Sequence, residues 1–284
     1  ATAGSLLYFP LVWVIGISLS AIVLVPFAEY VFFSTRMGGF GYDELTKWSY
    51  HPLELLQLFV PYIFGSTVPM SRWFGQYWLD TFYVGVLPLL LVACALRWSK
   101  KGMPYFLIGV VACSLLLAFG KYTPLFSVIR YVPGVNMIHY PVKYLFPAGF
   151  ALAILAGMGF SVLFEKVGKK ETGGMQRALI TVNLIALGML ISGALADEAL
   201  FNAFEQVYPQ TLFHKIVGTQ AAYLAIFKGY SIYVLTLTAV SVLLLFTARG
   251  RIPVPAAKLA AILLLLADLT FVARPDDALI ESSD

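Results

Sequence analysis

Four cationic or titratable side chains lie in one short stretch of the chain, residues 120 to 144. The stretch reads GKYTPLFSVIRYVPGVNMIHYPVKY, and the four residues are Lys121, Arg130, His139 and Lys143. Its prolines and glycines predict a loop, and an apolar segment long enough to cross a membrane follows without a break. Arginine can form two parallel hydrogen bonds to phosphate oxygens, and lysine supplies a point charge. The stretch therefore predicts a site for an anionic headgroup at a membrane surface.

Two further cations, Arg36 and Arg72, lie in the preceding long loop and join the same candidate phosphate-binding set. The alternative interpretation is that all these cations extend toward lipid headgroups and only anchor the loops. Both interpretations remain open from the sequence.

The carboxylates offer weaker candidates for acid/base or metal chemistry. Asp43 and Glu44 are adjacent and could hold a divalent cation, but two ligands without a third in register leave any cofactor unknown. His51 stands three residues before Glu54, which suits either a general base or an ordinary loop histidine. Asp80 is expected to cap or solvate a helix end, and Glu29 ends the first apolar segment.

Asp268 is the acidic residue that lies well within a predicted membrane segment. A carboxylate there is costly unless it is paired or faces a polar cavity. Lys228, near the end of another segment, is the expected partner, and a transport or catalytic role is the alternative.

The elements that must position these residues are membrane helices. Hydrophobic residues make up 60% of the chain, charged residues only 12%, and the mean hydropathy is +0.83. These values lie outside the range of soluble proteins and predict an all-α integral membrane protein, a single polytopic domain over 1–284. Seven spans are expected, at about 6–28, 81–97, 103–119, 144–164, 178–196, 224–247 and 259–273.

Basic residues predict how the spans are oriented. Three short loops hold ten of the nineteen Lys and Arg residues: Arg97, Lys100, Lys101, Lys166, Lys169, Lys170, Arg177, Arg249, Arg251 and Lys258. The positive-inside rule places these loops in the cytoplasm, so the N-terminus of this segment is expected inside and the C-terminus outside. The large loop 29–80 and the stretch 120–144 then lie on the outer face.

Short helices along the outer membrane surface are also expected. PLELLQLFVPYIF begins with Pro52 at a first helical position and repeats apolar residues at helical spacing, and the loop 197–223 is a second candidate. In the fourth span, Gly149, Ala153, Gly157 and Ser161 form a small-residue stripe that predicts close packing of another helix. This span is expected at the centre of the bundle.

The chain begins at Ala1 without the pattern of a signal peptide. We expect the first span to belong to the mature protein and the chain to be an internal part of a longer one. Cys94 and Cys113 lie within spans, where small buried thiols are the simplest interpretation.

Several segments together resemble a known family. VLVPFAEYVFFSTR (23–36), HPLELLQLFVPYIFG (51–65), GKYTPLFSVIRYVPG, HYPVKYLFPAGFALAILAGMG and the closing LLLLADLTFVAR are similar to bacterial YfhO-type membrane proteins. That family belongs to the GT-C class of glycosyltransferases, which take sugars from polyprenyl phosphate. The resemblance implies a bacterial cytoplasmic membrane, a role in the cell envelope and a lipid-linked sugar donor. It also implies catalytic acidic residues in a first outer loop upstream of this chain, so the catalytic residues here are unknown.

One position departs from the family pattern. Where relatives commonly carry arginine before the Pro that precedes the fourth span, this chain reads Ile138-His139-Tyr140-Pro141. If that arginine grips phosphate in relatives, the grip here should be weaker and pH-dependent, because histidine titrates near neutrality. Lys143 is retained.

Two other classes of function remain open from the sequence. A lipid or solute transporter is favoured by seven spans and the buried Asp268, although no pair of broken half-helices marks a central site. A non-catalytic subunit of a larger membrane complex would fit a chain without visible acid/base machinery. The expected partners are membrane lipids, the lipid-linked donor and subunits of such a complex, and no nucleic acid.

Overall fold

The computed structural model describes residues 3–65, 73–99, 102–132, 135–169, 171–207 and 219–273. Every regular element in these ranges is helical, which confirms the all-α fold class. The chain divides into two compact units. Unit 1 comprises Ala1–Lys47 and Phe126–Tyr140, and unit 2 comprises Trp48–Leu125 and Pro141–Asp284.

Unit 1 is built around one long apolar helix, α1 (Ala3–Phe32), followed by a 3₁₀ helix at Thr35–Gly38 and the short α2 (Tyr42–Leu45). Its second segment holds most of α5 (Leu125–Ile129) and a 3₁₀ helix at Val135–Met137. The Phe40 N–H donates to the Asn136 carbonyl oxygen at 2.9 Å, which joins the two segments of the unit. The apolar side chains of α1 are exposed, as expected of a helix surrounded by lipid.

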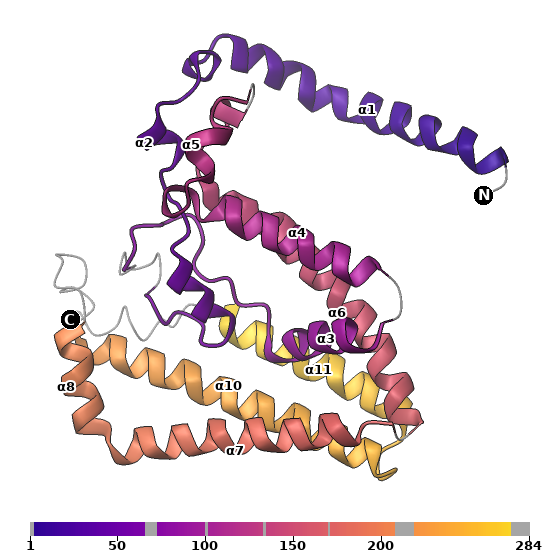
Figure 1. Ribbon diagram of the computed structural model, residues 1–284, viewed down its shortest axis with the longest axis vertical. Coiled ribbons are helices and arrows are strands. Elements are labelled where there is room, and N and C mark those ends of the chain that lie inside the picture. The colour runs from indigo at the N-terminus through magenta and orange to yellow at the C-terminus, as the bar shows by residue number, and fades with distance from the viewer. Residues whose placement is uncertain are drawn as a thin grey trace. The chain divides into compact units, whose positions relative to one another are not determined.

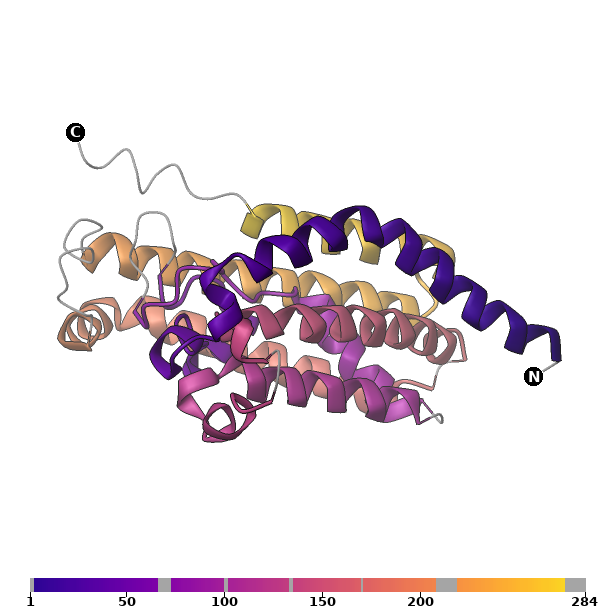
Figure 2. The same ribbon diagram turned by 90° about the horizontal axis from the view of Figure 1, so that it is seen from above.

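Unit 2 is a helical bundle centred on α6. Its helices are α3 (Val86–Trp98), α4 (Met103–Ala118), α6 (Leu145–Gly168), α7 (Gly173–Leu195), α8 (Asp197–Val207), α10 (Thr219–Ala248) and α11 (Val254–Ala273). Helix α6 packs against α3, α4, α10 and α11, so the predicted central position of this span is confirmed. Figures 1 and 2 show α7 and α10 running side by side, with α8 turning back from the end of α7.

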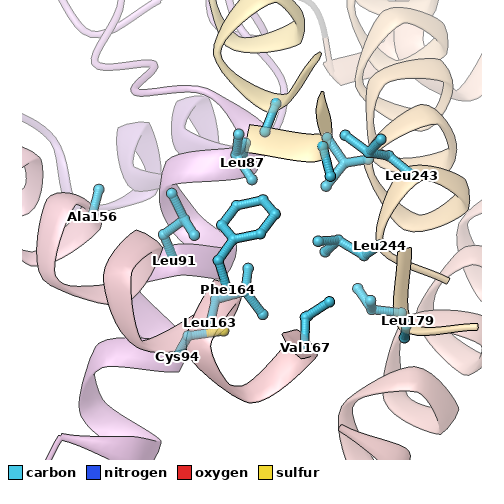
Figure 3. Close-up of a cluster of buried hydrophobic side chains, with 14 residues drawn as sticks. Leu87, Leu91, Cys94, Ala156, Leu163, Phe164, Val167, Leu179, Leu243 and Leu244 are labelled. Atoms are coloured by element: carbon cyan, nitrogen blue, oxygen red, sulfur yellow. The ribbon is translucent and has the colours of Figure 1, made fainter. Parts of the chain in front are cut away.

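The core of unit 2 joins five of its helices. Phe164 of α6 projects into a cluster with Leu91 of α3, Leu179 of α7 and Leu244 of α10 (Figure 3), and Ala257 and Ala261 of α11 complete it. These side chains are buried because each helix turns one face inward, whereas its lipid-facing positions stay apolar and exposed.

Helices α3 and α6 approach each other closely at Gly159. A Cβ there would overlap the backbone carbonyl of Leu91, so α3 and α6 can touch only because residue 159 is glycine. The predicted stripe is wrong in this respect. Ala153, Gly157 and Ser161 are exposed, because the face of α6 that packs against α3 is rotated away from them.

Polar side chains join α7 to α10. Asn183 donates from Nδ2 to Ser241 Oγ at 2.7 Å and accepts from Thr238 Oγ1 at 3.0 Å. One turn further along, the Tyr230 hydroxyl donates to the Ala186 carbonyl oxygen at 3.0 Å. Such bonds add to helix association in hydrocarbon, where no water competes for the polar groups.

Five helices in the described part of the chain are long and apolar enough to cross a membrane: Pro10–Phe32, Pro141–Gly168, Gly173–Leu195, Ala222–Ala248 and Val254–Val272. The protein is therefore a multi-pass membrane protein. The other two predicted spans, 81–97 and 103–119, form the shorter apolar helices Val86–Trp98 and Met103–Ala118. The predicted start at residue 81 is wrong, because residues 81–85 form no regular secondary structure and α3 begins after Gly85. The count of seven spans stays a prediction.

The three cation-rich loops lie at one end of the unit 2 bundle. Trp98 at the end of α3, Met175 at the start of α7 and Val254 at the start of α11 all pack against the same core cluster. Helix α4 runs from this end to residues 118–122, and α6 runs back from residues 141–144. These two segments of the stretch 120–144 therefore lie at the opposite end of the bundle.

Candidate functional site

Three segments of unit 2 meet at the end of the bundle opposite the cation-rich loops. We call residues 48–51, 118–122 and 141–144 the loop scaffold. The Tyr50 N–H donates to the Ala118 carbonyl oxygen at 2.9 Å, and the Lys121 N–H donates to Ser49 Oγ at 3.0 Å. Gly120, at φ +50°, lies where a Cβ would overlap both Ser49 Oγ and the Pro141 ring. Glycine is thus required for the three segments to touch.

The loop scaffold carries two of the predicted phosphate-binding residues, Lys121 and Lys143. Lys143 Nζ lies 4.6 Å from the centroid of the Trp78 ring, which itself lies 5.8 Å from the Trp48 ring. Lys121 Nζ lies 5.3 Å from the Tyr122 ring. Both ammonium groups are therefore held beside aromatic rings, an arrangement that suits the boundary between lipid and water.

Arg130 and His139, the other two residues of the predicted set, belong to unit 1. The Arg130 guanidinium lies between the rings of Tyr42 and Tyr131 at 5.5 and 4.8 Å, and its Nη2 donates to the Tyr131 hydroxyl at 2.6 Å. The His139 ring makes edge contacts with Phe40 at 4.7 Å and Tyr140 at 3.7 Å. The structure thus sorts the predicted set into two pairs, one in each unit.

The remaining predicted residues are distributed as follows. Arg36 lies in the 3₁₀ helix Thr35–Gly38, and Arg72 lies outside the described residues. Asp43 and Glu44 are exposed in α2, with Glu44 4.0 Å from Lys47. Within the described ranges, no group of three or more His, Cys, Asp or Glu side chains could hold a metal ion.

The predicted surface helix at Pro52 is a 3₁₀ helix, Pro52–Leu58, with inverted polarity. Leu53 and Leu56 are about half exposed, at 53% and 47%, whereas Glu54 and Gln57 are both at 0%. A 3₁₀ helix has three residues per turn, so Leu53 stands above Leu56 and Glu54 above Gln57. The apolar side thus faces outward, and the polar side faces into the protein.

His51 holds the start of this 3₁₀ helix. Its Nδ1 accepts from the Leu53 N–H at 3.2 Å, which places the ring proton on Nε2 in the neutral form. The ring stacks on Phe74 with centroids 3.8 Å apart and meets Tyr122 edge-on at 4.6 Å. His51 is therefore a capping and packing residue in the described structure.

In the loop scaffold, His51 and Tyr122 have pKa values shifted by a charged neighbour as well as by burial. Burial, followed by the positive charge of Lys121, lowers the pKa of His51 below its ordinary value. Burial, followed by the negative charge of Glu54, raises the pKa of Tyr122. The carboxylate of Glu54 and the ammonium of Lys121 thus act on neighbouring groups of one cluster.

Buried polar groups continue behind the 3₁₀ helix. Gln57 Oε1 accepts from the Phe82 N–H at 3.2 Å, which orients the amide. Gln57 Nε2 and the hydroxyl of the adjoining Thr81 are also buried, and neither forms a hydrogen bond within the described residues. Gln76, at 0% exposure, differs because its amide bonds to the backbone of Trp78 and Leu79.

Asp268 is buried, but its partners differ from the predicted one. Its carboxylate accepts from the Tyr83 hydroxyl at 2.9 and 3.0 Å and from the Val86 N–H at 3.1 Å. Val86 is the first residue of α3, so Asp268 on α11 caps the N-terminus of a neighbouring helix. Lys228, the predicted partner, lies 5.9 Å from the Phe271 ring.

Sequence analysis missed three residues of this region: Gln57, Thr81 and Tyr83. For Gln57 a signal was present, because Glu54 and Gln57 are three apart, as are Leu53 and Leu56. For Thr81 and Tyr83 the sequence held no sign of a separate polar site. Both lie in a segment that continues the apolar character of the helix that follows.

Comparisons of this chain with protein-family models, curated proteins and solved structures gave no match.

Proposed function

We propose that this protein binds a polyprenyl-phosphate-linked sugar at the outer face of a bacterial cytoplasmic membrane and takes part in transferring that sugar to an acceptor on the same face. The catalytic acidic group implied by the YfhO and GT-C resemblance is not assigned to a residue of this chain.

The observation that carries the proposal is the placement of Lys121 and Lys143 on the loop scaffold. Two cations belong to one hydrogen-bonded set of loops, beside aromatic rings, at the end of the bundle opposite the cation-rich loops. Cations used only for anchoring need no common set of loops, whereas a phosphate needs its cationic donors in the same part of the structure. Lipid-facing Leu53 and Leu56 beside the scaffold suit a polyprenyl chain.

Equilibrium binding of undecaprenyl phosphate to the purified chain in nanodiscs tests the proposal. Lys121→Ala and Lys143→Ala should each weaken binding about tenfold to a hundredfold, the range for losing a charge-assisted contact. Arg130→Ala tests the pair in unit 1 in the same way. Lys258→Ala is the matched control, because it removes an exposed cation from the other end of the bundle. Unchanged affinity in all three test variants would contradict the proposal.

Because His139 replaces the arginine expected from the family pattern, the same binding measurement is repeated as a function of pH. If His139 contributes to phosphate binding, affinity should rise as the pH falls below about 6.5, where a histidine gains charge. His139→Arg should bind more tightly and lose this dependence. An identical pH profile in the wild type and His139→Arg would exclude His139 from the site.

A further inference from the structure

A set of buried polar side chains lies directly behind the phosphate-binding end of the loop scaffold. Glu54 and Gln57 project from the inward side of the 3₁₀ helix, both fully buried, and Thr81 stands next to Phe82, whose N–H holds Gln57. Glu54 acts on Tyr122, the neighbour of Lys121 in the chain. The set therefore adjoins the cation that the proposed function assigns to phosphate.

Two donors of this set are not used by the protein. Gln57 Nε2 and Thr81 Oγ1 are buried and form no hydrogen bond among the described residues. Exchanging the oxygen and nitrogen of the Gln57 amide would not give Nε2 a partner. In that orientation the amide N–H would face the Phe82 N–H, and two donors would meet. Buried polar groups normally have partners, so both donors point to a molecule other than the described residues of the chain.

The chemistry of the set defines that molecule. Gln57 Nε2 needs an acceptor, and Thr81 Oγ1 can donate or accept. An anion is disfavoured, because the Glu54 carboxylate is buried on the same side of the 3₁₀ helix. A neutral hydroxyl group meets all three requirements, since it accepts from Gln57 and can donate to Thr81 or Glu54.

We propose that Glu54, Gln57 and Thr81 recognise a hydroxyl group of the sugar on the lipid-linked donor. This inference rests on the proposed function, and it adds the residues that distinguish a sugar-bearing lipid from the bare lipid phosphate. The lysines of the loop scaffold hold the phosphate, and the buried set holds the sugar next to it.

The ratio of two affinities tests the inference. The chain in nanodiscs is titrated with undecaprenyl phosphate and with the same lipid carrying glucose, galactose, mannose or N-acetylglucosamine. At least one sugar should raise affinity over the bare lipid. Thr81→Val and Gln57→Glu should each lower that gain about threefold to tenfold, the usual worth of one neutral hydrogen bond, while leaving bare-lipid binding unchanged.

The variants are chosen to preserve the fold. Thr81→Val is nearly isosteric and removes a hydroxyl that bonds to nothing in the described protein, so its apo thermal stability should equal or exceed that of the wild type. Gln57→Glu keeps an oxygen toward the Phe82 N–H and replaces the amide donor with a second carboxyl oxygen. Because this acid is buried beside Glu54, its apo thermal stability is measured next to that of the wild type. Lys143→Ala is the contrasting variant, since it should weaken all lipids equally and leave the sugar gain intact.

The outcomes separate the two proposals. Equal affinity for the bare lipid and all four sugar-bearing lipids, with Lys143→Ala still weakening each, would overturn the inference and leave the proposed function standing. A sugar gain that Thr81→Val and Gln57→Glu leave unchanged would show a bound water only and would also overturn it. No binding of any of these lipids would overturn the proposed function and the inference with it.

Discussion

At the scale of residues, the buried polar side chains of this membrane protein are held by backbone groups as much as by other side chains. Asp268 accepts from the Val86 N–H, Gln57 from the Phe82 N–H, and His51 from the Leu53 N–H. Each of these N–H groups stands at or near the end of an irregular segment. The polar residues thus stabilise the places where the helical bonding pattern is interrupted.

Removing the Asp268 carboxylate should destabilise the bundle. Asp268→Ala leaves the Tyr83 hydroxyl and the Val86 N–H buried without a partner, so we expect a loss of about 1–3 kcal/mol in the free energy of unfolding. Tyr83→Phe should cost less, about 0.6–1.7 kcal/mol, since it removes one side-chain bond to α11 and leaves the Val86 N–H with its partner. Reversible unfolding in mixed detergent micelles measures both, with the exposed Glu205→Ala as control. A change below about 0.5 kcal/mol for Asp268→Ala would show that this cap contributes little.

His51 should make the stability of unit 2 depend on pH. Its pKa is lowered in the folded state, so above about pH 6.5 it is neutral in both states and its capping contribution is fully present. As the pH falls below about 6.5, the unfolded chain takes up a proton that folded His51 resists, and stability decreases. His51→Asn keeps a capping acceptor but does not titrate. Thermal unfolding between about pH 5 and 7.5 should therefore show a steeper acid loss in the wild type than in His51→Asn, and parallel curves would refute this role.

At the scale of elements, hydropathy predicted which segments are helical, but it did not predict which side of each helix is buried. The long apolar segments around 144–164, 178–196, 224–247 and 259–273 all became helices, because only a helix satisfies its own backbone in lipid. The start of α3 was predicted too early, since Thr81 to Gly85 are as apolar as the helix itself. The rotation of α6 was missed, because many of its positions are small and only the neighbouring helix selects one.

Some features of the candidate site could likewise be predicted from the sequence, and others could not. Lys121 and Lys143 could be predicted as members of a larger cationic set, because charge at a membrane surface is visible in the sequence, but the division of that set between two units could not. The burial of Glu54 and Gln57 could not, because a polar face beside an apolar one is normally expected to face water. Here the apolar face lies outward, which reverses the usual rule at a lipid boundary.

Two glycines of α6 provide a matched test of the packing between α3 and α6. Gly159→Ala places a Cβ against the Leu91 carbonyl and should cost about 1–3 kcal/mol, because backbone atoms have little room to move. Gly157→Ala meets no atom within 4 Å and should be neutral or slightly stabilising through helix propensity. Unfolding of both variants in the same micelles gives the comparison. Equal stability would mean that α3 and α6 do not approach at Gly159.

At the scale of the whole molecule, the cation-rich loops and the candidate binding residues lie at different ends of unit 2. The core cluster gathers the cation-rich loops at one end, whereas the loop scaffold, the inverted 3₁₀ helix and the Asp268 cap lie toward the other. Unit 1 carries Arg130 and His139 on a separate aromatic frame. The proposed phosphate site therefore lies at the end of unit 2 away from the cation-rich loops.

Photo-crosslinking with a photoreactive undecaprenyl phosphate, followed by peptide mass spectrometry, tests this account most directly. The chain in nanodiscs should be labelled in the unit 2 segments 48–65, 73–82, 118–125 and 141–144, and excess unlabelled undecaprenyl phosphate should compete the label away. The combined variant Lys121→Ala, Lys143→Ala should lose most of it, whereas Lys258→Ala should not. Labelling confined to the loops at 165–177 and 248–258, or label that unlabelled lipid phosphate does not displace, would contradict a phosphate site on the loop scaffold.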